Sequence, residues 1–563
     1  MSLQITERKG PNKEISLLFI NANVITLDNE NRIAGSVAVA EGRIIGIWEK
    51  NEPPEGEISI TEKTNVVDLK GATLLPGFID THNHILMYGT MRNMLNCSTP
   101  PNETIEDIKT LIAEQARITP TGEWIVGFGY DDTLLAEKRH PTLKDIDLVS
   151  PNHPVMLIHT SGHLAVANTV ALELAGLSDD TKDPQKGGHY GRDSNGKLNG
   201  VLYESAAQMP VRMKMPVKTE KEMLEDLEFA AKQYLAQGIT TNSDAAVSTL
   251  AELEVHTKAA ASGINPMRTH LMLMHHLLRK GEAFGEFTNE MLDEEIKKKS
   301  NGLARLDSAK MFQDGSIQGL TGALRKPYYN NPDVYGELMF TQEDLEQEVL
   351  DLHQRGFRVT THGNGDRAIG SIIDAYENAL KKNPRNNHKH RIEHLQSATS
   401  EDIAKMAQLG IAGSFFINHV YYWGDRHEQI FLGPERARRI SPLKDAVDND
   451  VLFTLHSDCP VTPISPLFSV CAAVNRKTSS GKILGPEQRI DVITALKSMT
   501  IYGAKLIMDE ENVGSIEIGK CADFVVLEED PISVEPDRIK DIKIQATYIE
   551  GQIVYDAKDL SNH

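Results

Sequence analysis

The long middle of the chain alternates apolar, strand-like segments with helical ones, and this alternation predicts a parallel α/β fold. Segments such as 224–237 and 401–409 have the character of the connecting helices. The candidate strands lie at 72–81, 238–245, 267–274, 304–312, 356–363, 390–395, 411–417 and 451–458. Eight such strands fit a TIM-type (β/α)8 barrel, in which the chemistry sits at the C-terminal ends of the strands.

Both ends of the chain have a different texture from the middle. Short β-type runs broken by Asn, Gly and Pro fill the stretch from Ile15 to Val67, and similar runs return near the C-terminus. This pattern is typical of antiparallel sheet. We therefore expect residues 1–70 and 512–563 to form one composite β-sandwich domain, with the barrel spanning residues 71–511.

One segment is too long for a minimal barrel. Residues 94–217, between the first and second candidate strands, contain helices and strands of their own. An insertion of this length is usually functional. Because it follows the C-terminal end of the first strand, we expect it to roof the site and to shape the substrate pocket.

Composition excludes several classes of partner. The 563 residues carry a formal net charge of −21, which argues against nucleic acid and against anionic membranes, since both need clustered Lys and Arg. The four cysteines, Cys97, Cys459, Cys471 and Cys521, are too few for a disulfide framework. The polar N-terminal segment lacks the apolar core of a signal peptide. A cytoplasmic protein is the expected result.

The stretch LLPGFIDTHNH ends in His82 and His84. A strand places residues i and i+2 on the same face, so both imidazoles would point at one place, as metal ligands do. A lone HxH is short and is equally compatible with ordinary polar residues at a strand end. Further polar residues follow the other candidate strands: Asp244, His275, Lys310, His362, His394 and Asp458.

Several motifs occur together along the barrel: PGFIDTHNH, AKMFQDGS, THGNGD, RIEHLQ and HSDCPVTP. With them the chain resembles the amidohydrolase superfamily. More narrowly it is similar to the N-substituted formamide deformylase-like (YtcJ-like) branch, in which SGHLAVAN, NGVLYESA and GKCADFVVL also have counterparts. Each motif alone is weak, but their joint occurrence covers nearly the whole chain.

The resemblance implies a site with two divalent metal ions, zinc being the expected one. His82, His84 and Asp458 would hold one ion, and His362 and His394 the other. Lys310 would bridge the two as a carboxylated lysine. Imidazole and carboxylate suit zinc or a similar ion, and burial in a barrel lowers a lysine pKa in the direction that carboxylation needs.

Such a site implies hydrolysis of a non-peptide C–N bond, in an amide or formamide, by a metal-bridging hydroxide. Metal coordination lowers the pKa of water from about 16 toward ~7. Asp458 would take the proton from the water and return it to the leaving nitrogen. The expected partner is a small amide, and a homodimer is possible.

Some residues and functions stay open at this stage. His163, His275 and His456 could touch substrate or make structural hydrogen bonds, and Asp314 could fix a loop or line the pocket. His456 stands where the family pattern leads us to expect a small residue. The alternatives to hydrolysis are a mononuclear-metal deaminase of a cyclic amidine and a catalytically inactive regulatory or scaffold relative. Lys310 favours the two-metal hydrolase, because a bridging group has no role with one ion.

Overall fold

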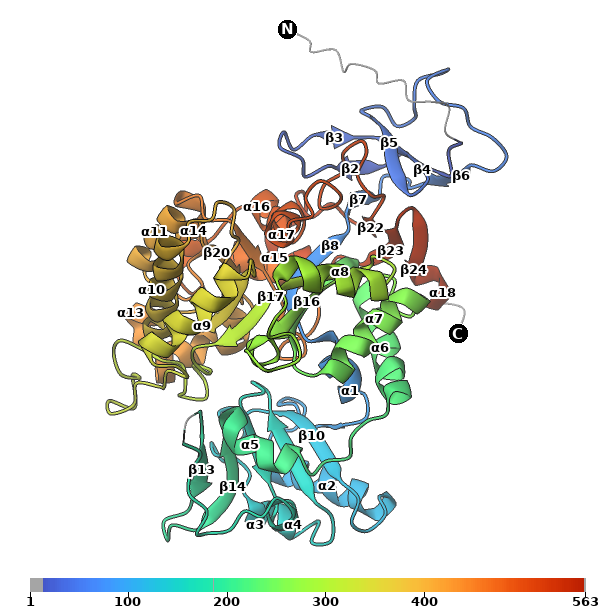
Figure 1. Cartoon of the computed structure of the whole chain (residues 1–563). Helices are drawn as coiled ribbons and strands as arrows, with labels where there is room; N and C mark the ends of the chain where they lie inside the picture. Colours follow the sequence, from blue (N-terminus) through green and yellow to red (C-terminus); the bar gives the residue numbers. More distant parts are fainter. Residues whose placement is uncertain (1–13, 186, 561–563) are drawn as a thin grey trace.

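The structure, a computed structural model, describes residues 14–185 and 187–560. The residues before Glu14 lie outside this range. The expected lack of a signal peptide depends mainly on them and therefore stays a prediction. The described chain forms a central barrel with a β-sandwich at one end and a separate sheet at the other (Figure 1). Among the described residues, no helix has both the length and the apolar character needed to cross a membrane.

The barrel consists of eight strands in chain order, and each strand is paired in parallel with the next. They are β8 (Phe78–Asn83), β15 (Ile239–Val247), β16 (Arg268–Met274), β17 (Ala304–Phe312), β18 (Val359–Gly363), β19 (Arg391–His394), β20 (Ala412–Phe415) and β21 (Phe453–Leu455). A hydroxyl pair, Thr81 Oγ1 and Thr454 Oγ1 at 2.8 Å, links the first strand to the last. The predicted barrel is confirmed, with a nearly closed seam.

One predicted strand is in fact two. The stretch 72–81 divides into β7 (Thr73–Pro76), which pairs with β2 (Asn23–Ile25) and β22 (Phe524–Leu527) in the sandwich, and β8 in the barrel. The break falls at Gly77, where an added Cβ would lie 2.2 Å from Thr240 Oγ1. Only glycine fits this close crossing from one sheet to the other.

Helices pack around the barrel and bury their apolar faces against it (Figure 1). Helix α6 shows why they form: Thr219 and Glu222 make a reciprocal capping box at its start, and Leu227 and Tyr234 on one face are fully buried. Burial of a side chain such as Leu227 stabilises the folded state by about 1.5–3 kcal/mol. The helices are α1 (Ile85–Met91), α6 (Glu220–Leu235), α7 (Leu250–Ser262), α8 (Asn289–Lys299), α9 (Gln342–Gln354), α10 (Asp366–Lys382), α11 (Ser400–Leu409), α12 (His419–Arg426), α13 (Gly433–Ala437), α14 (Leu443–Asp448), α15 (Pro466–Asn475), α16 (Val492–Ser498) and α17 (Ile501–Ile507).

The two chain ends meet in the sandwich, as predicted. One sheet has the order β5 (Arg43–Trp48), β4 (Ser36–Ala40), β1 (Leu17–Ile20) and β6 (Asn65–Asp68). The other has the order β24 (Gln552–Asp556), β23 (Ile544–Ile549), β22 (Phe524–Leu527), β7, β2 (Asn23–Ile25) and β3 (Ile33–Ala34). Between them, the Phe19 ring meets Phe524 and Tyr548 edge to face, with centroids at 5.6 and 5.2 Å. Aromatic burial of this kind joins the N- and C-terminal segments into one core.

The insertion builds a third sheet, on the side of the barrel opposite the sandwich (Figure 1). Its strand order is β13 (His189–Arg192), β14 (Leu198–Tyr203), β12 (Leu164–Ala167), β11 (Val155–His159), β10 (Ile125–Tyr130) and β9 (Leu95–Asn96). Its helices are α2 (Ile105–Ile118), α3 (Leu143–Asp147), α4 (Thr169–Leu174) and α5 (Glu204–Arg212). The large insertion after the first barrel strand is therefore confirmed.

Candidate metal centre

Two adjacent strand ends place three of the predicted ligands around one carboxylate oxygen. His82 and His84 come from the end of β8, and Asp458 follows β21. Asp458 Oδ1 lies 3.2 Å from His82 Nε2 and 3.3 Å from His84 Nε2. Burial alone would raise the pKa of Asp458, but the contacts with the two histidines hold it well below its ordinary value. The spacing of the HxH motif thus produces the convergence that the strand geometry predicts.

The next strands add further imidazoles to the same cluster. The His394 ring, from β19, lies 4.9 Å from the His82 ring and 4.4 Å from that of His362, at the end of β18. His394 Nδ1 is 3.9 Å from Asp458 Oδ2. His394 and Asp458 both have left-handed backbones, with φ of 72° and 52°. Such strained conformations concentrate at functional sites, and here two ligands have them.

His456 joins this cluster, although the family pattern led us to expect a small residue there. Its ring is fully buried, 4.5 Å from the His82 ring and 5.1 Å from the His394 ring. Neither of its nitrogens has a hydrogen-bond partner among the described residues. The centre is therefore richer in imidazole than the sequence motifs alone imply.

Lys310 lies on β17, the fourth barrel strand, and is completely buried. Its Nζ has no hydrogen-bond partner in the described chain and sits 5.0 Å from the centre of the Phe312 ring. Burial lowers its pKa to about 8, and the charges of Glu393 and Asp458 only partly oppose that shift. With a pKa of about 8, roughly a tenth of this amine is uncharged at pH 7, far more than for an ordinary lysine, and the uncharged form is the one that can react with carbon dioxide.

The donor atoms of this cluster fit metal ions. Buried polar atoms normally find hydrogen-bond partners, and those that do not call for an explanation. Lys310 Nζ, His394 Nδ1 and Asp458 Oδ1 are all buried without one in the described residues. Two overlapping triads each have ligand atoms within 4.8 Å of one another: His82, His84 and Asp458; and His82, His394 and His456. Bound cations would satisfy the His394 nitrogen and the Asp458 oxygen, whereas Lys310 could join them only after losing its positive charge.

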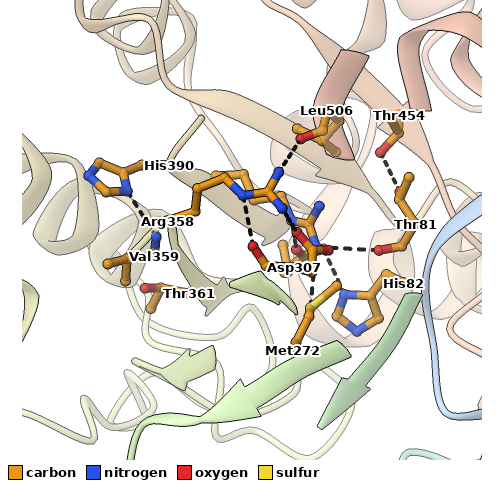
Figure 2. A network of polar contacts seen from close by, with 12 residues as sticks. Thr81, His82, Met272, Asp307, Arg358, Val359, Thr361, His390, Thr454 and Leu506 are labelled. Carbon is orange, nitrogen blue, oxygen red and sulfur yellow. Dashed lines mark hydrogen bonds and ion pairs between the residues drawn. The ribbon is translucent and has the colours of Figure 1, made fainter. Parts of the chain in front are cut away.

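A buried series of ion pairs, called the charge ladder below, leads from Arg358 and Asp307 to His82 (Figure 2). His82 Nδ1 donates to Glu393 Oε2 at 2.6 Å, which leaves Nε2 facing Asp458. Glu393 accepts from Arg391 at 2.5 Å, and Arg391 donates to Asp307 at 2.9 Å. Asp307 in turn pairs with Arg358 at 2.8 Å. A carboxylate that fixes the second nitrogen of a ligand histidine sets its tautomer and orientation.

Sequence reasoning missed Glu393, although it stands inside the quoted motif RIEHLQ. In a regular strand Arg391 and Glu393 share one face, and His394 should point to the other. The left-handed turn at His394 breaks this alternation. The period-two pairing of Arg391 with Glu393 was the signal that could have identified a buried ion pair.

The insertion reaches the centre through His163. Its ring lies 5.3 Å from the His362 ring, and its Nδ1 contacts Glu204 Oε2 at 2.7 Å. Gln208 Nε2 and the Glu204 amide both donate to the His163 carbonyl, at 2.9 and 2.8 Å. Glu204 itself has φ of 63°. His163 is thus firmly held beside a candidate ligand.

A second contact fastens the insertion to the barrel. Arg426 Nη1, at the end of α12, lies 2.6 Å from Asp131 Oδ2, and Trp423 Nε1 donates to the same oxygen at 3.3 Å. Asp131, Asp132 and His159 also have ligand atoms within 4.8 Å. Both oxygens of Asp131 already accept hydrogen bonds. We therefore assign Asp131 the role of anchoring the insertion to the barrel rather than of holding a metal.

Three other residues near strand ends have structural partners. The buried Asp314 carboxylate accepts backbone N–H groups of Asn364, Gly365 and Ala323 at 2.7–3.0 Å, so it fixes the loop after β17. His275 pairs with Glu348 at 2.8 Å. Asp244 lies 3.1 Å from His256. The structure gives each of them a partner outside the candidate ligand set.

Comparisons with known proteins agree with this picture. The model of the amidohydrolase family matches residues 65–555. The chain is 29% identical to the N-substituted formamide deformylase of Arthrobacter pascens over 550 residues, 96% of this chain and 98% of that enzyme. It is also 29% identical to YtcJ of Bacillus subtilis (strain 168) over 547 residues, 95% and 98% of the two chains. An uncharacterized metal-dependent hydrolase from Pyrococcus horikoshii has the same fold, with a TM-score of 0.72 at 23% identity, over 92% of this chain and 99% of that one.

Proposed function

We propose, from the premise that the chain belongs to the amidohydrolase family, that it is a metal-dependent hydrolase of a non-peptide C–N bond in an amide or formamide. The observation that carries this proposal is Lys310. Its amine is completely buried and without a hydrogen-bond partner in the described chain, among imidazoles and a carboxylate. A buried cation in such a place is costly, whereas a carboxylated lysine would be an anionic ligand.

The proposed ligands divide into two groups. His82, His84 and Asp458 would hold one ion. His362 and His394 would hold the second, and Lys310 would bridge both. Two details support this division: the hydrogen bond to Glu393 leaves His82 Nε2 free, and Asn364 Nδ2, at 2.9 Å, engages His362 Nε2, which leaves His362 Nδ1.

The bridging group requires a covalent step that the site favours. The neutral amine of Lys310 adds to carbon dioxide, a new N–C bond forms, and one proton is lost to water. The product is a carbamate with two oxygens and one negative charge. Burial lowers the lysine pKa to about 8 and so supplies the neutral amine.

When bound, divalent ions lower the pKa of a coordinated water and polarise a carbonyl group. The chain's own contribution is proton transfer and orientation. Asp458 would accept the proton of the attacking water and return it to the leaving nitrogen. Glu393 would hold His82 in one tautomer, and His163, held by Glu204, would line the substrate side of the centre.

The substrate class rests on relatives and on the insertion. An N-substituted formamide deformylase is similar to this chain over nearly its whole length, and this supports an N-formyl or N-acyl amine as substrate. The insertion contributes His163 beside His362, so its residues would decide which acyl and amine groups fit. We also propose that the enzyme works in the cytoplasm, which the four free, buried cysteines support.

A second candidate is a single-metal deaminase of a cyclic amidine. The observation in its favour is that the two candidate triads share His82, and His456 supplies a ligand atom to one of them. In that case one ion would suffice and Lys310 would remain unmodified. Metal analysis of the purified protein distinguishes the two candidate functions. We expect roughly two ions per chain for the hydrolase and about one for the deaminase.

The direct test of the reaction is a substrate screen with metal-reconstituted protein. N-formyl amines, N-acetyl amines and cyclic amides are incubated with the enzyme, and the released amine is measured. We expect turnover of open-chain amides, and N-formyl compounds should be the best. Release of ammonia from cyclic amidines without amide cleavage would instead establish the deaminase.

A further inference from the structure

A cavity of about 270 Å³ lies at the opposite end of the barrel, where β16 and β17 begin beside the sandwich. Four cationic side chains contribute to its wall, together with one histidine and one carboxylate. They are Arg43, Arg268, Lys297, Arg305, His270 and Asp509. The whole chain carries a formal net charge of −21, so a cavity lined mainly by cations stands apart from the general composition.

Two of these cations are already neutralised by carboxylates. Arg268 pairs with Asp523 at 3.1 Å and with Glu550 at 2.7 Å. Lys297 pairs with Asp293 at 2.9 Å and with a neighbouring glutamate at 3.0 Å. These two side chains therefore contribute to the shape of the wall, but little of their positive charge remains to attract an anionic ligand.

The other two cations are under-neutralised. Arg43 donates from Nη1 to two neutral oxygens, Asn512 Oδ1 and the Gly519 carbonyl, both at 3.2 Å, and forms no ion pair within the described chain. Arg305 donates from Nη2 to Asp293 Oδ2 at 3.5 Å and lies 3.9 Å from Asp509, and both contacts are longer than those of Arg268 with its carboxylates. Arg305 Nε is buried without a hydrogen-bond partner among the described residues. Each guanidinium thus keeps donor capacity for an anion.

The histidine in the wall is also unsatisfied. His270, on β16, is 2% exposed, and its Nδ1 is buried without a hydrogen-bond partner in the described part of the chain. The next strand places Arg305 directly beside it in the parallel ladder. An imidazole nitrogen and a guanidinium N–H therefore flank the same space from neighbouring strands, and His270 can donate to a ligand there when Nδ1 carries the ring proton.

We propose that this cavity binds a small oxyanion, the phosphate or carboxylate group of a small metabolite, between Arg305 and His270 of the barrel and Arg43 of the sandwich. Guanidinium forks match the geometry of both groups, and a charge-assisted hydrogen bond is about twice as strong as a neutral one. The volume holds one such group with a short substituent. Nothing in this proposal depends on the reaction at the other end of the barrel.

Binding has a structural consequence that can be measured. An anion between Arg43 and Arg305 joins the sandwich to the barrel, since the two arginines belong to different parts of the fold. A ligand that binds only the folded state stabilises it in proportion to RT ln(1 + [L]/Kd). The Tm should therefore rise with anion concentration and follow the binding curve.

The test uses the full chain, with inorganic phosphate and succinate as probes and chloride to keep ionic strength constant. Calorimetric titration and Tm are measured for wild type, Arg43→Gln, Arg305→Gln and Arg117→Gln. Arg117 is an exposed residue of α2 in the insertion, so it controls for the change in net charge.

We expect saturable binding of phosphate, succinate or both, and the tighter probe identifies the preferred group. Kd should rise about tenfold or more in Arg43→Gln and Arg305→Gln, as for loss of a charged hydrogen bond, and stay unchanged in Arg117→Gln. If Arg305→Gln does not fold, the Kd of Arg43→Gln alone decides the question. The Arg43 side chain is exposed, so its replacement should leave the fold intact. Absence of saturable binding by either probe, or equal weakening in Arg117→Gln, overturns the proposal.

Discussion

The two ends of the barrel expose opposite kinds of unsatisfied polar atoms. At the C-terminal end, His394 Nδ1 and Asp458 Oδ1 are buried without hydrogen-bond partners in the described chain, and both suit cations; Lys310 Nζ beside them is also unpartnered and would suit cations only in the proposed carboxylated form. At the N-terminal end, Arg305 keeps a buried donor without one, which suits an anion. Buried polar groups without partners are expensive, so each end is most stable with its own ligand bound. The same strands thus offer sites of opposite sign, about one barrel length apart.

The interior between the two ends explains why they do not neutralise each other. Arg358, Asp307, Arg391 and Glu393 alternate in sign and pair in that order at 2.5–2.9 Å, and Figure 2 labels Arg358 and Asp307 of this set. This ladder satisfies its own charges, and only its last member, Glu393, contacts a candidate ligand. In the proposed centre, Glu393 at the end of this ladder would orient His82, and bound ions would balance the charge of Asp458.

The largest expected effect at the metal end comes from Lys310→Ala. Loss of the bridging anion should lower metal content and reduce turnover to the background rate, as followed by elemental analysis and amine release. Short carboxylic acids should restore part of the activity, since they can occupy the vacated position. A variant with a full metal complement and full activity would remove Lys310 from the ligand set.

Asp458→Asn should come next. The amide keeps one oxygen ligand but cannot accept a proton at neutral pH, so kcat should fall by ~10²-fold or more, the usual scale for a lost general base. Metal content is measured on the same preparation. A variant that binds its metal normally and turns over at the wild-type rate would assign the proton to another group, and His456 would be examined first.

Glu393→Gln tests whether the ladder orients the centre. The amide is isosteric but loses the negative charge that faces His82, so metal affinity should fall by about 10–100-fold. Glu348→Gln is the matched control, because Glu348 also accepts from a histidine, His275, that lies outside the ligand set. Equal effects of the two changes would mean that Glu393 contributes only general stability.

Changes in the insertion should have smaller and selective effects. His163→Asn should alter the ratio of kcat/KM between N-formyl and N-acetyl substrates by several-fold, a range typical of pocket contacts. Metal content should stay unchanged. If the variant lowers only Tm and leaves every substrate ratio as in wild type, the insertion does not select substrates through this residue.

The anion end predicts a pH effect on stability rather than on rate. Burial lowers the pKa of His270 from 6.5 to about 4. Between these values the unfolded chain binds a proton that the folded chain refuses, so the free energy of unfolding decreases as pH falls from 6.5 to 4, by up to about 3 kcal/mol. His270→Leu should show a shallower decrease in denaturant unfolding over this range. Identical slopes in both proteins would contradict the assignment.

The sequence singled out the residues of the candidate metal centre but not those of the N-terminal cavity, for a physical reason. His82 lies on β8 and His84 directly follows that strand, at the N-terminal cap of α1, and the other predicted ligands lie on or just after recognisable strands. Local spacing therefore encodes most of that centre. The left-handed backbone at His394 and its consequence for Glu393 depend on tertiary contacts, and no local pattern indicates them.

The anion cavity could not be predicted in this way. Its walls come from four separate segments, at residue 43, residues 268–270, residues 297–305 and residues 509–521. The four cations stand in no quoted motif, although the last segment overlaps the start of GKCADFVVL, and each cation alone resembles an ordinary surface residue. Only the meeting of the sandwich with the barrel brings them together. The same holds for the contact between Asp131 and Arg426, which spans 295 residues.

We propose that six residues at the C-terminal end of the barrel hold a pair of metal ions bridged by a modified lysine. Anomalous diffraction from crystals of the zinc-loaded protein tests this most directly. A two-metal centre predicts a pair of anomalous peaks, one beside His82, His84 and Asp458 and one beside His362 and His394. Density for a carboxylated Lys310 should lie between them. A single peak with an unmodified Lys310 would contradict this proposal.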